Sequence, residues 1–232
     1  MNTLIYAVAL MFLQQPIFPP APPVLVVSGS AQVFAAPDQA MVRLGIVRQS
    51  PNAQTAQEQA NAVAQEILSA IRKVGIPAQQ IQTARLILSP VYAPRSPESR
   101  DAPRIAGYNA TNSVSVRVED LSLVGAVIDA GLKAGANQLD GVQFGLRNDL
   151  PSREQALKEA VQEARSKAQV MADALRVNLT EVLEVSEGGV SILPQSEGAF
   201  AARMAAAVET PVSPGQIQVN ANVTIRYRIA PK

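Results

Sequence analysis

RIAGYNATNSVSVRVEDLSLVGAVIDAGLKAGANQLDGVQFGL, residues 104–146, is the stretch that decides the fold. Within it, residues 113–118 alternate serine or arginine with valine, which is the period of a strand with one buried face. Asp120 then supplies a helix N-cap, apolar residues recur at helical spacing, and Gly135 supplies a C-terminal stop. A second alternating run begins at Val142. The stretch therefore predicts strand, helix and strand in succession, and it carries no signature of a reaction.

The composition of the 232 residues is that of a folded protein, with 47% hydrophobic and 17% charged residues. This length can hold one large domain or two small ones. The net charge is +1, with Lys and Arg scattered among acidic residues, so no basic stripe is available for a phosphate backbone. Aromatic residues make up only 4% and Trp is absent, which leaves no platform for stacked bases. We therefore expect no nucleic-acid partner.

The sequence contains neither cysteine nor histidine. Their absence excludes thiol nucleophiles, disulfides, thiolate metal sites and every His-dependent triad or metal site within this chain. No nucleophile elbow, P-loop or dinucleotide-binding fingerprint stands in the strand-turn-helix setting that its chemistry requires. We therefore predict no enzyme activity, no catalytic, cofactor-binding or metal-binding residues, and no cofactor.

The acidic residues have structural explanations. Five aspartates fall at expected turns, caps or helix ends, where carboxylates bond backbone amides: Asp38, Asp120, Asp129, Asp140 and Asp149. Glu98 and Asp101, with nearby serines, could hold a hard cation loosely, but they lack the alternating ligand spacing of a calcium loop.

Residues 1–23 read as an export-signal-like segment followed by a spacer. Residues 4–13, LIYAVALMFL, are apolar, which is about half of the roughly 20 residues that a membrane-spanning helix needs. Their length suits the hydrophobic region of an export signal, although no Lys or Arg precedes them and no clean A-x-A site follows. The alternative is a packed or disordered tail. Residues 14–23, QQPIFPPAPP, predict an extended polyproline spacer. We expect a periplasmic or otherwise exported protein rather than a cytoplasmic one, with no stable membrane span after signal removal.

The segment that follows predicts a hairpin, a helix and a strand. Residues 24–49 contain two apolar-rich runs around Ala36-Pro37-Asp38, which favours a hairpin. Residues 53–74 carry one apolar stripe at helical spacing, and a glycine ends this helix. Residues 81–92 predict a strand, which Pro90 confines to an edge or a bend. Residues 93–106, rich in proline and charge, predict a mobile loop.

The last third of the chain predicts a long helix and a long strand. Ser152 and Gln155 match a capping box with Pro151 just outside it, and the expected apolar line is dominated by alanine, so that a partner surface can approach closely. That line comprises Leu157, Ala160 or Val161, Ala164, Ala168, Met171 and Leu175. Residues 181–186 predict a short strand, and 195–215 a loop or short surface helix. Residues 216–229 alternate almost without fault, and a strand of this length must pair with a hairpin partner, a sheet running through both units, or a neighbouring subunit.

Together these patterns predict an α+β fold with two strand-helix-strand units, antiparallel sheets, three main helices and a long C-terminal strand. We expect one domain over residues 24–232, with units at about 24–92 and 104–230 joined by the loop 93–106.

Several short motifs follow one another in a fixed order: VSGSAQV at 27–33, Pro37-Asp38, V-x-LGI at 42–46, GYNATN at 107–112, Asp120-Leu121, Gly135-Ala136-Asn137 and the alanine-rich 156–174. In this order they resemble the SIMPL-domain family, from about residue 24 to 229. Its bacterial members are described as periplasmic immunogenic or oxidative-stress defence proteins. The resemblance implies an exported, non-enzymatic α+β protein, with ring-like or channel-like oligomers known in the family, and it carries over no catalytic residue.

The sequence thus favours an exported structural or interaction protein that forms homo-oligomers and supports envelope or oxidative stress tolerance. The alternative is a small-molecule or peptide-binding module that uses a cleft between the two units and the loop 93–106. A hydrolase using carboxylates alone lacks a nucleophile-base pair. Other protein partners stay open.

Overall fold

The computed structural model describes residues 22–94, 102–195, 210 and 212–232. The predicted α+β class is confirmed: the described chain forms two antiparallel sheets and three α-helices. The strands are β1 Val24–Ala35, β2 Gln39–Ser50, β3 Ile81–Tyr92, β4 Ile105–Val118, β5 Gln138–Gly145, β6 Val177–Gln195 and β7 Gln216–Pro231. The helices are α1 Ala53–Lys73, α2 Val124–Lys133 and α3 Leu150–Leu175, with 3-10 turns at Ala78–Gln80 and Leu121–Leu123.

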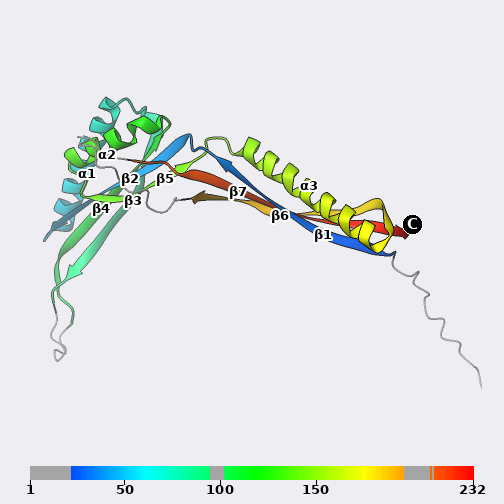
Figure 1. Ribbon diagram of the computed structural model, residues 1–232. Helices are drawn as coiled ribbons and strands as arrows, with labels where there is room; N and C mark the ends of the chain where they lie inside the picture. The colour runs from blue at the N-terminus through cyan, green and yellow to red at the C-terminus, as the bar shows by residue number, and fades with distance from the viewer. Residues whose placement is uncertain (1–21, 95–101, 196–209, 211) are drawn as a thin grey trace, which may run out of the picture.

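The two sheets lie end to end in an elongated, arched molecule (Figure 1). The four-stranded sheet has the order β3-β4-β2-β5, and α1 and α2 pack on it. The three-stranded sheet has the order β1-β7-β6, and α3 runs along it. The predicted segment 104–146 is confirmed as β4, α2 and β5 in succession.

The four-stranded sheet contains both strand-helix-strand units. Its connectivity, β2-α1-β3 followed by β4-α2-β5, together with its strand order, is that of a ferredoxin-like sheet. The sequence predicted a division at residues 93–106, yet β3 and β4 on either side of that segment pair with each other. The strands of this sheet therefore lie within residues 39–145, and those of the three-stranded sheet within 24–35 and 177–231.

The predicted hairpin over residues 24–49 is wrong. β1 pairs with β7 from Val24–Arg228 to Ala35–Ile217, whereas β2 lies between β4 and β5 in the other sheet. The short connection after β1 runs onward instead of turning back, because the Asp38 N–H donates to the Gly145 carbonyl at the end of β5. Two long partner strands from elsewhere in the chain outcompete the local turn signal.

The helices of the four-stranded sheet follow their sequence signals. Asn52 caps α1 by accepting from the Thr55 N–H at 3.1 Å. Gly75 follows the helix with a φ of +105°, a backbone conformation that only glycine adopts without strain, and so ends it. Asp120 caps the 3-10 turn that precedes α2, and Gly135, with φ +103°, follows α2. The strand β3 with Pro90 is an edge strand, as predicted.

The predicted start of α3 is wrong, whereas its close approach to the sheet is confirmed. The helix begins at Leu150, so Ser152 and Gln155 lie inside it, because Pro151 fits a first helical turn that needs no N–H. The buried stripe consists of alanines four residues apart: Ala156, Ala160, Ala164, Ala168 and Ala172. Met171 and Leu175 are exposed instead. This alanine stripe lets α3 lie directly against Gly29 of β1.

The long C-terminal strand is confirmed as β7, and it is the central strand of its sheet, between β1 and β6. β6 is longer than the predicted strand 181–186. Its pairing with β7 is irregular at three places, which disrupts the alternation that sequence reading depends on. Residues 95–101 and nearly all of 196–211 lie outside the described part of the chain, as does the export-like segment.

Two apolar cores hold the sheets to their helices. One lies under α1 and α2 and includes Val42, Leu44 and Ile67. The other lies under α3 and includes its alanines and the inward face of β7. Phe144, at the end of β5, packs against both cores. The junction between the two sheets is therefore a packed contact as well as a chain crossing.

Candidate functional site

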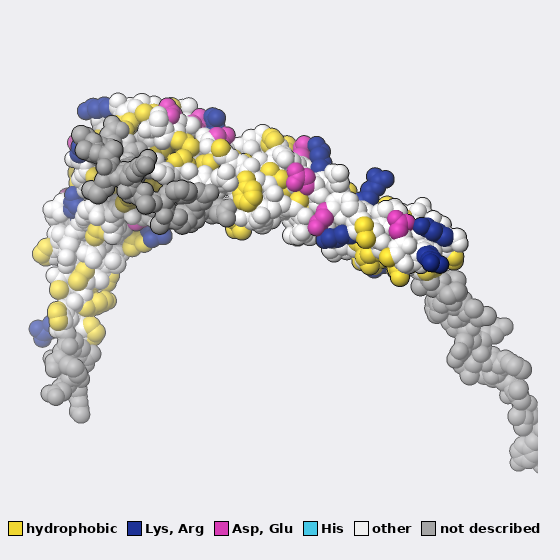
Figure 2. All heavy atoms as spheres, in the orientation of Figure 1, with side chains coloured by type: hydrophobic (Ala, Val, Ile, Leu, Met, Phe, Trp, Pro, Cys, Tyr) yellow, Lys and Arg dark blue, Asp and Glu magenta, His cyan; other side chains and the backbone are white. Residues whose placement is uncertain are grey.

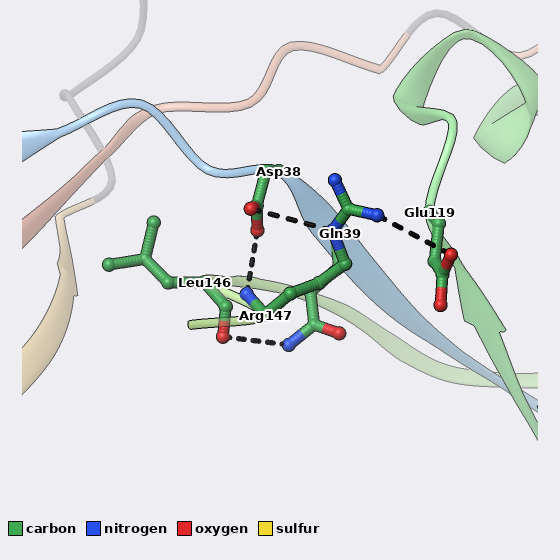
Figure 3. Close-up of polar contacts among 5 residues, drawn as sticks. All are labelled: Asp38, Gln39, Glu119, Leu146 and Arg147. Carbon is green, nitrogen blue, oxygen red and sulfur yellow. Dashed lines mark hydrogen bonds and ion pairs between the residues drawn. The ribbon is translucent and has the colours of Figure 1, made fainter. Parts of the chain in front are cut away.

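The junction of the two sheets carries a cluster of polar contacts (Figure 3). Asp38 precedes β2, Glu119 follows β4, and Arg147 follows β5. The Arg147 backbone N–H donates to Asp38 Oδ1 at 2.7 Å, and its guanidinium lies 3.5 Å from both Asp38 Oδ2 and Glu119 Oε2. Gln39 Nε2 donates to the Leu146 carbonyl at 2.9 Å. These bonds tie the two chain crossings between the sheets together.

The polar contacts at this junction restrain the chain where it crosses between the sheets. Arg147 is shared by two carboxylates, and both ion pairs are about half exposed to solvent. Such pairs contribute only about 0–1 kcal/mol each. The stronger restraints are the backbone-mediated bonds and the packing of Phe144. The cluster contains no hydroxyl or amine nucleophile beside a general base. The arrangement can fix the angle between the sheets.

The predicted capping role is confirmed for Asp120 and Asp38, which both accept from backbone amides. The hydroxyl and the N–H of Ser122 donate to Asp120 and hold the pKa of its carboxyl below the usual value. The prediction is wrong for Asp140, which lies inside β5, and for Asp129, which lies within α2.

Asp149 stands at the N-terminus of α3, as expected, but its side chain caps no backbone amide. It pairs instead with Arg153 one turn later, with Nε and Oδ2 2.8 Å apart. Glu98 and Asp101, the two acidic residues considered for a loosely held cation, lie outside the described residues. Within the described ranges, no three acidic side chains converge as metal ligands would.

A contact that the sequence did not predict joins the connection between β6 and β7 to α2. Thr210 Oγ1 donates to Asp129 Oδ1 at 2.6 Å, and a Cβ at Gly125 would lie only 2.7 Å from the Thr210 carbonyl oxygen. Val212 packs against the core under α1 and α2. The connection between β6 and β7, two strands of the three-stranded sheet, therefore contacts the helix and the core of the four-stranded sheet. No local sequence signal could have revealed this long-range contact.

The edge strand β3 exposes apolar side chains on both of its faces. Leu86 and Leu88 are paired with Asn112 and Ala110 on the face that α1 covers, but α1 lies over β4 and β2, so both leucines remain exposed. Ile87 is exposed on the opposite face. Figure 2 shows hydrophobic side chains, in yellow, on the part of the molecule at the lower left, where β3 and β4 extend in Figure 1. An exposed apolar edge strand is a typical site of contact between proteins.

Grooves run along both sides of α3. One, of about 470 Å³, lies between α3 and β6 and is lined by Val161, Arg165, Val182, Val185 and Tyr227 among others. The second, of about 610 Å³, lies between α3 and β1. Both grooves lie on the three-stranded sheet, whereas the sequence predicted a cleft between the two strand-helix-strand units and the loop 93–106. None of the helices in the described ranges combines the length and the apolar character needed to cross a bilayer.

Comparison with known proteins gives the class of this protein. The profile of SIMPL, described as a protein of unknown function (DUF541), matches residues 25–227, so the chain belongs to the SIMPL family. The resemblance seen in the sequence is confirmed.

Named relatives include a 26 kDa periplasmic immunogenic protein of Brucella melitensis, which is 33% identical over 212 residues, covering 88% of this chain and 84% of that protein. The protein of the same name from Brucella abortus matches equally. The uncharacterized protein YggE of Escherichia coli K12 is 29% identical over 166 residues, covering 72% of this chain and 66% of that protein.

Proposed function

We propose that this chain is an exported, non-enzymatic structural or interaction protein that associates with further copies of itself and supports envelope or oxidative stress tolerance. Export is supported by the apolar residues 4–13 and by the periplasmic name of the Brucella relatives. Self-association is supported above all by the exposed apolar edge of β3.

The β3 edge combines two driving forces for association. Among the described residues no strand lies beside its outer backbone groups, because β3 is the last strand of its sheet. Leu86 is 58% exposed, and Leu88 and Ile87 are exposed as well. Fully burying a leucine contributes about 1.5–3 kcal/mol, so covering each of these side chains with a second copy contributes on the order of 1 kcal/mol. The irregular pairing near Thr83 and at Tyr92 limits the regular edge to the residues between them.

The test compares the mass of two matched variants by size-exclusion chromatography with light scattering. Leu86→Lys places a charge on the β3 edge, whereas Leu175→Lys places the same charge on the last turn of α3, at a leucine that is 60% exposed. We expect the wild type and Leu175→Lys to run as assemblies and Leu86→Lys to run as a smaller species. Circular dichroism establishes that both variants are folded.

A strictly monomeric wild type at micromolar concentration would refute self-association. An assembly that survives Leu86→Lys would remove β3 from the interface. The role in stress tolerance is tested separately, by the survival of peroxide treatment in a strain that lacks the protein and in one that carries Leu86→Lys. Equal survival of the deletion strain and its parent would refute that role.

A second candidate function is a small-molecule or peptide-binding module, and the groove between α3 and β6 favours it. The groove presents Val182 and Val185 of β6 beside Val161 of α3, with Arg165 at its border. A ligand that binds only the folded protein must raise the melting temperature. A thermal-shift screen with apolar carboxylates tests this function. A ligand of the groove should raise the melting temperature of the wild type but not that of Val182→Lys. If no compound behaves in this way, the binding function is refuted.

A further inference from the structure

β1 is the regular edge of the three-stranded sheet. It pairs with β7 through 12 successive residues without a bulge. The opposite edge, β6, is interrupted at three places. Bulges twist an edge and hinder the addition of another strand, whereas a long regular edge invites it. Of the two edges of this sheet, β1 is therefore the one that needs protection from strand pairing.

The outward backbone groups of β1 belong to its even-numbered residues. The carbonyl of Pro23 accepts from the Ile229 N–H of β7, so the odd-numbered residues that follow Pro23 point their N–H and C=O groups toward β7. Val24, Val26, Ser28 and Ser30 therefore present their N–H and C=O groups away from β7.

Two side chains of α3 bond this outer edge. Lys167 Nζ donates to the Ser28 carbonyl at 3.2 Å, and the Glu163 carboxylate accepts from the Ser30 N–H. The two side chains also form an ion pair, with Lys167 Nζ and Glu163 Oε1 2.9 Å apart. They supply one donor and one acceptor to neighbouring edge groups, in place of bonds that two residues of an added antiparallel strand would make.

The position of α3 makes this contact possible. Gly29 lies between the two bonded serines, and a Cβ there would be 2.1 Å from the Ala160 carbonyl oxygen and 2.5 Å from the Ala164 backbone nitrogen. The helix therefore lies directly over the strand at this residue, as Figure 1 shows for α3 along β1. Only at such a short separation can Glu163 and Lys167 reach past the sheet face to its edge.

We propose that Glu163 and Lys167 form a guard on the β1 edge, which prevents β1 of a second copy from extending the three-stranded sheet. A second copy is the occupant that fits, because a two-fold axis would set the same even-numbered donors and acceptors of two β1 strands against each other. Val24 and Val26 are exposed beside the edge, and Val170 and Met171 of α3 line the adjoining groove, so removing the guard leaves an apolar strand-binding site. The guard is independent of the association proposed for β3.

The experiment removes the guard in the Leu86→Lys chain, so that association through β3 does not mask a new contact. Glu163→Ala/Lys167→Ala deletes both bonds to the edge. The matched control is Glu154→Ala/Lys158→Ala, which deletes a second Glu–Lys pair with the same spacing on α3 that, among the described residues, makes no bond to a strand. We expect the guard variant, but not the control, to dimerise at concentrations about tenfold lower than the parent chain. Amide hydrogen exchange at Val26, Ser28 and Ser30 should become slower in that dimer.

Two further variants keep the test decisive if the double alanine variant does not fold. Glu163→Lys/Lys167→Glu retains an ion pair and the net charge, but it places a donor at the Ser30 N–H and an acceptor at the Ser28 carbonyl, so it should dimerise. Glu163→Gln retains an acceptor for the Ser30 N–H and should behave as the parent. If the folded guard variants show the same mass at every concentration as the control, with fast exchange at the β1 edge, the guard is refuted.

Discussion

Gly29→Ala is the sharpest test of how α3 meets β1. The added methyl group would meet the Ala160 carbonyl oxygen at 2.1 Å and the Ala164 nitrogen at 2.5 Å. Both atoms belong to the helix backbone, so no side chain can swing away to make room. Ordinary van der Waals contact begins at 3.4 Å, so the helix must retreat from the strand by more than an ångström along this line.

The magnitude follows from that displacement. Overpacking of a well-packed core costs about 1–3 kcal/mol and occasionally more. We expect a loss of about 3 kcal/mol, at the upper end, because the obstacle is backbone and because the retreat loosens the contacts of the buried alanines of α3. For a chain of this size each kcal/mol lowers Tm by about 2–4 °C, which gives a decrease of roughly 6–12 °C.

The assay is urea unfolding followed by circular dichroism, with Gly145→Ala as the control. Gly145 has only ordinary contacts, the nearest being Gln39 Nε2 at 3.6 Å, so its replacement should change the free energy of unfolding by less than about 1 kcal/mol. Hydrogen exchange should become faster in α3 and β1 of Gly29→Ala and remain unchanged in α1. If Gly29→Ala unfolds at the same urea concentration as Gly145→Ala, the close packing of α3 on β1 is wrong.

Three other changes have expected outcomes. Arg147→Ala should lower the free energy of unfolding by no more than about 1 kcal/mol in a urea titration, because its ion pairs are half exposed and its backbone bond to Asp38 is kept. A loss above about 2 kcal/mol would contradict this expectation. Thr210→Val should cost about 1.5 kcal/mol by losing the hydrogen bond to Asp129, while Thr210→Ser should keep it, and equal melting of the two variants would show that the bond contributes nothing. The Ser30 N–H of β1 and the Lys167 ammonium hold the pKa of the Glu163 carboxyl below its ordinary 4.5. This carboxylate therefore stabilises the folded protein above pH 4.5, and the stabilisation is lost as the pH falls through the lowered pKa of the folded state. Wild type should therefore lose more stability than Glu163→Gln between neutral and strongly acidic pH, and parallel pH profiles would refute the assignment.

Local patterns predicted much of the fold. The stretch 104–146 became β4, α2 and β5, and residues 53–74 became α1, because alternation, helical spacing, caps and glycine stops are all short-range signals. The long strand β7 was equally plain. The start of α3 was misplaced by three residues, with Ser152 expected as the N-cap and Asp149 found there, because a proline can stand either before a helix or in its first turn.

The candidate surfaces could not be predicted in the same way. Pro90 placed β3 at an edge or a bend, but the sequence did not show that Leu86 would be exposed there, since apolar side chains in a strand ordinarily indicate burial. Nor did it show that Asp129 would meet Thr210, because 81 residues separate them in the chain. The bond between Glu163 and the β1 edge depends on the same kind of long-range approach.

The sequence by itself determined which segments become strands and helices, the absence of cysteine and histidine chemistry, and the likeness to the SIMPL family. Tertiary structure alone decided that β1 and β2 part at Asp38 and enter different sheets, that β7 becomes the centre of one of them, and that α3 lies close enough to guard an edge. The physical reason is that local periodicity specifies the kind of element and its buried face, whereas strand partners are chosen by the burial and pairing that distant segments offer.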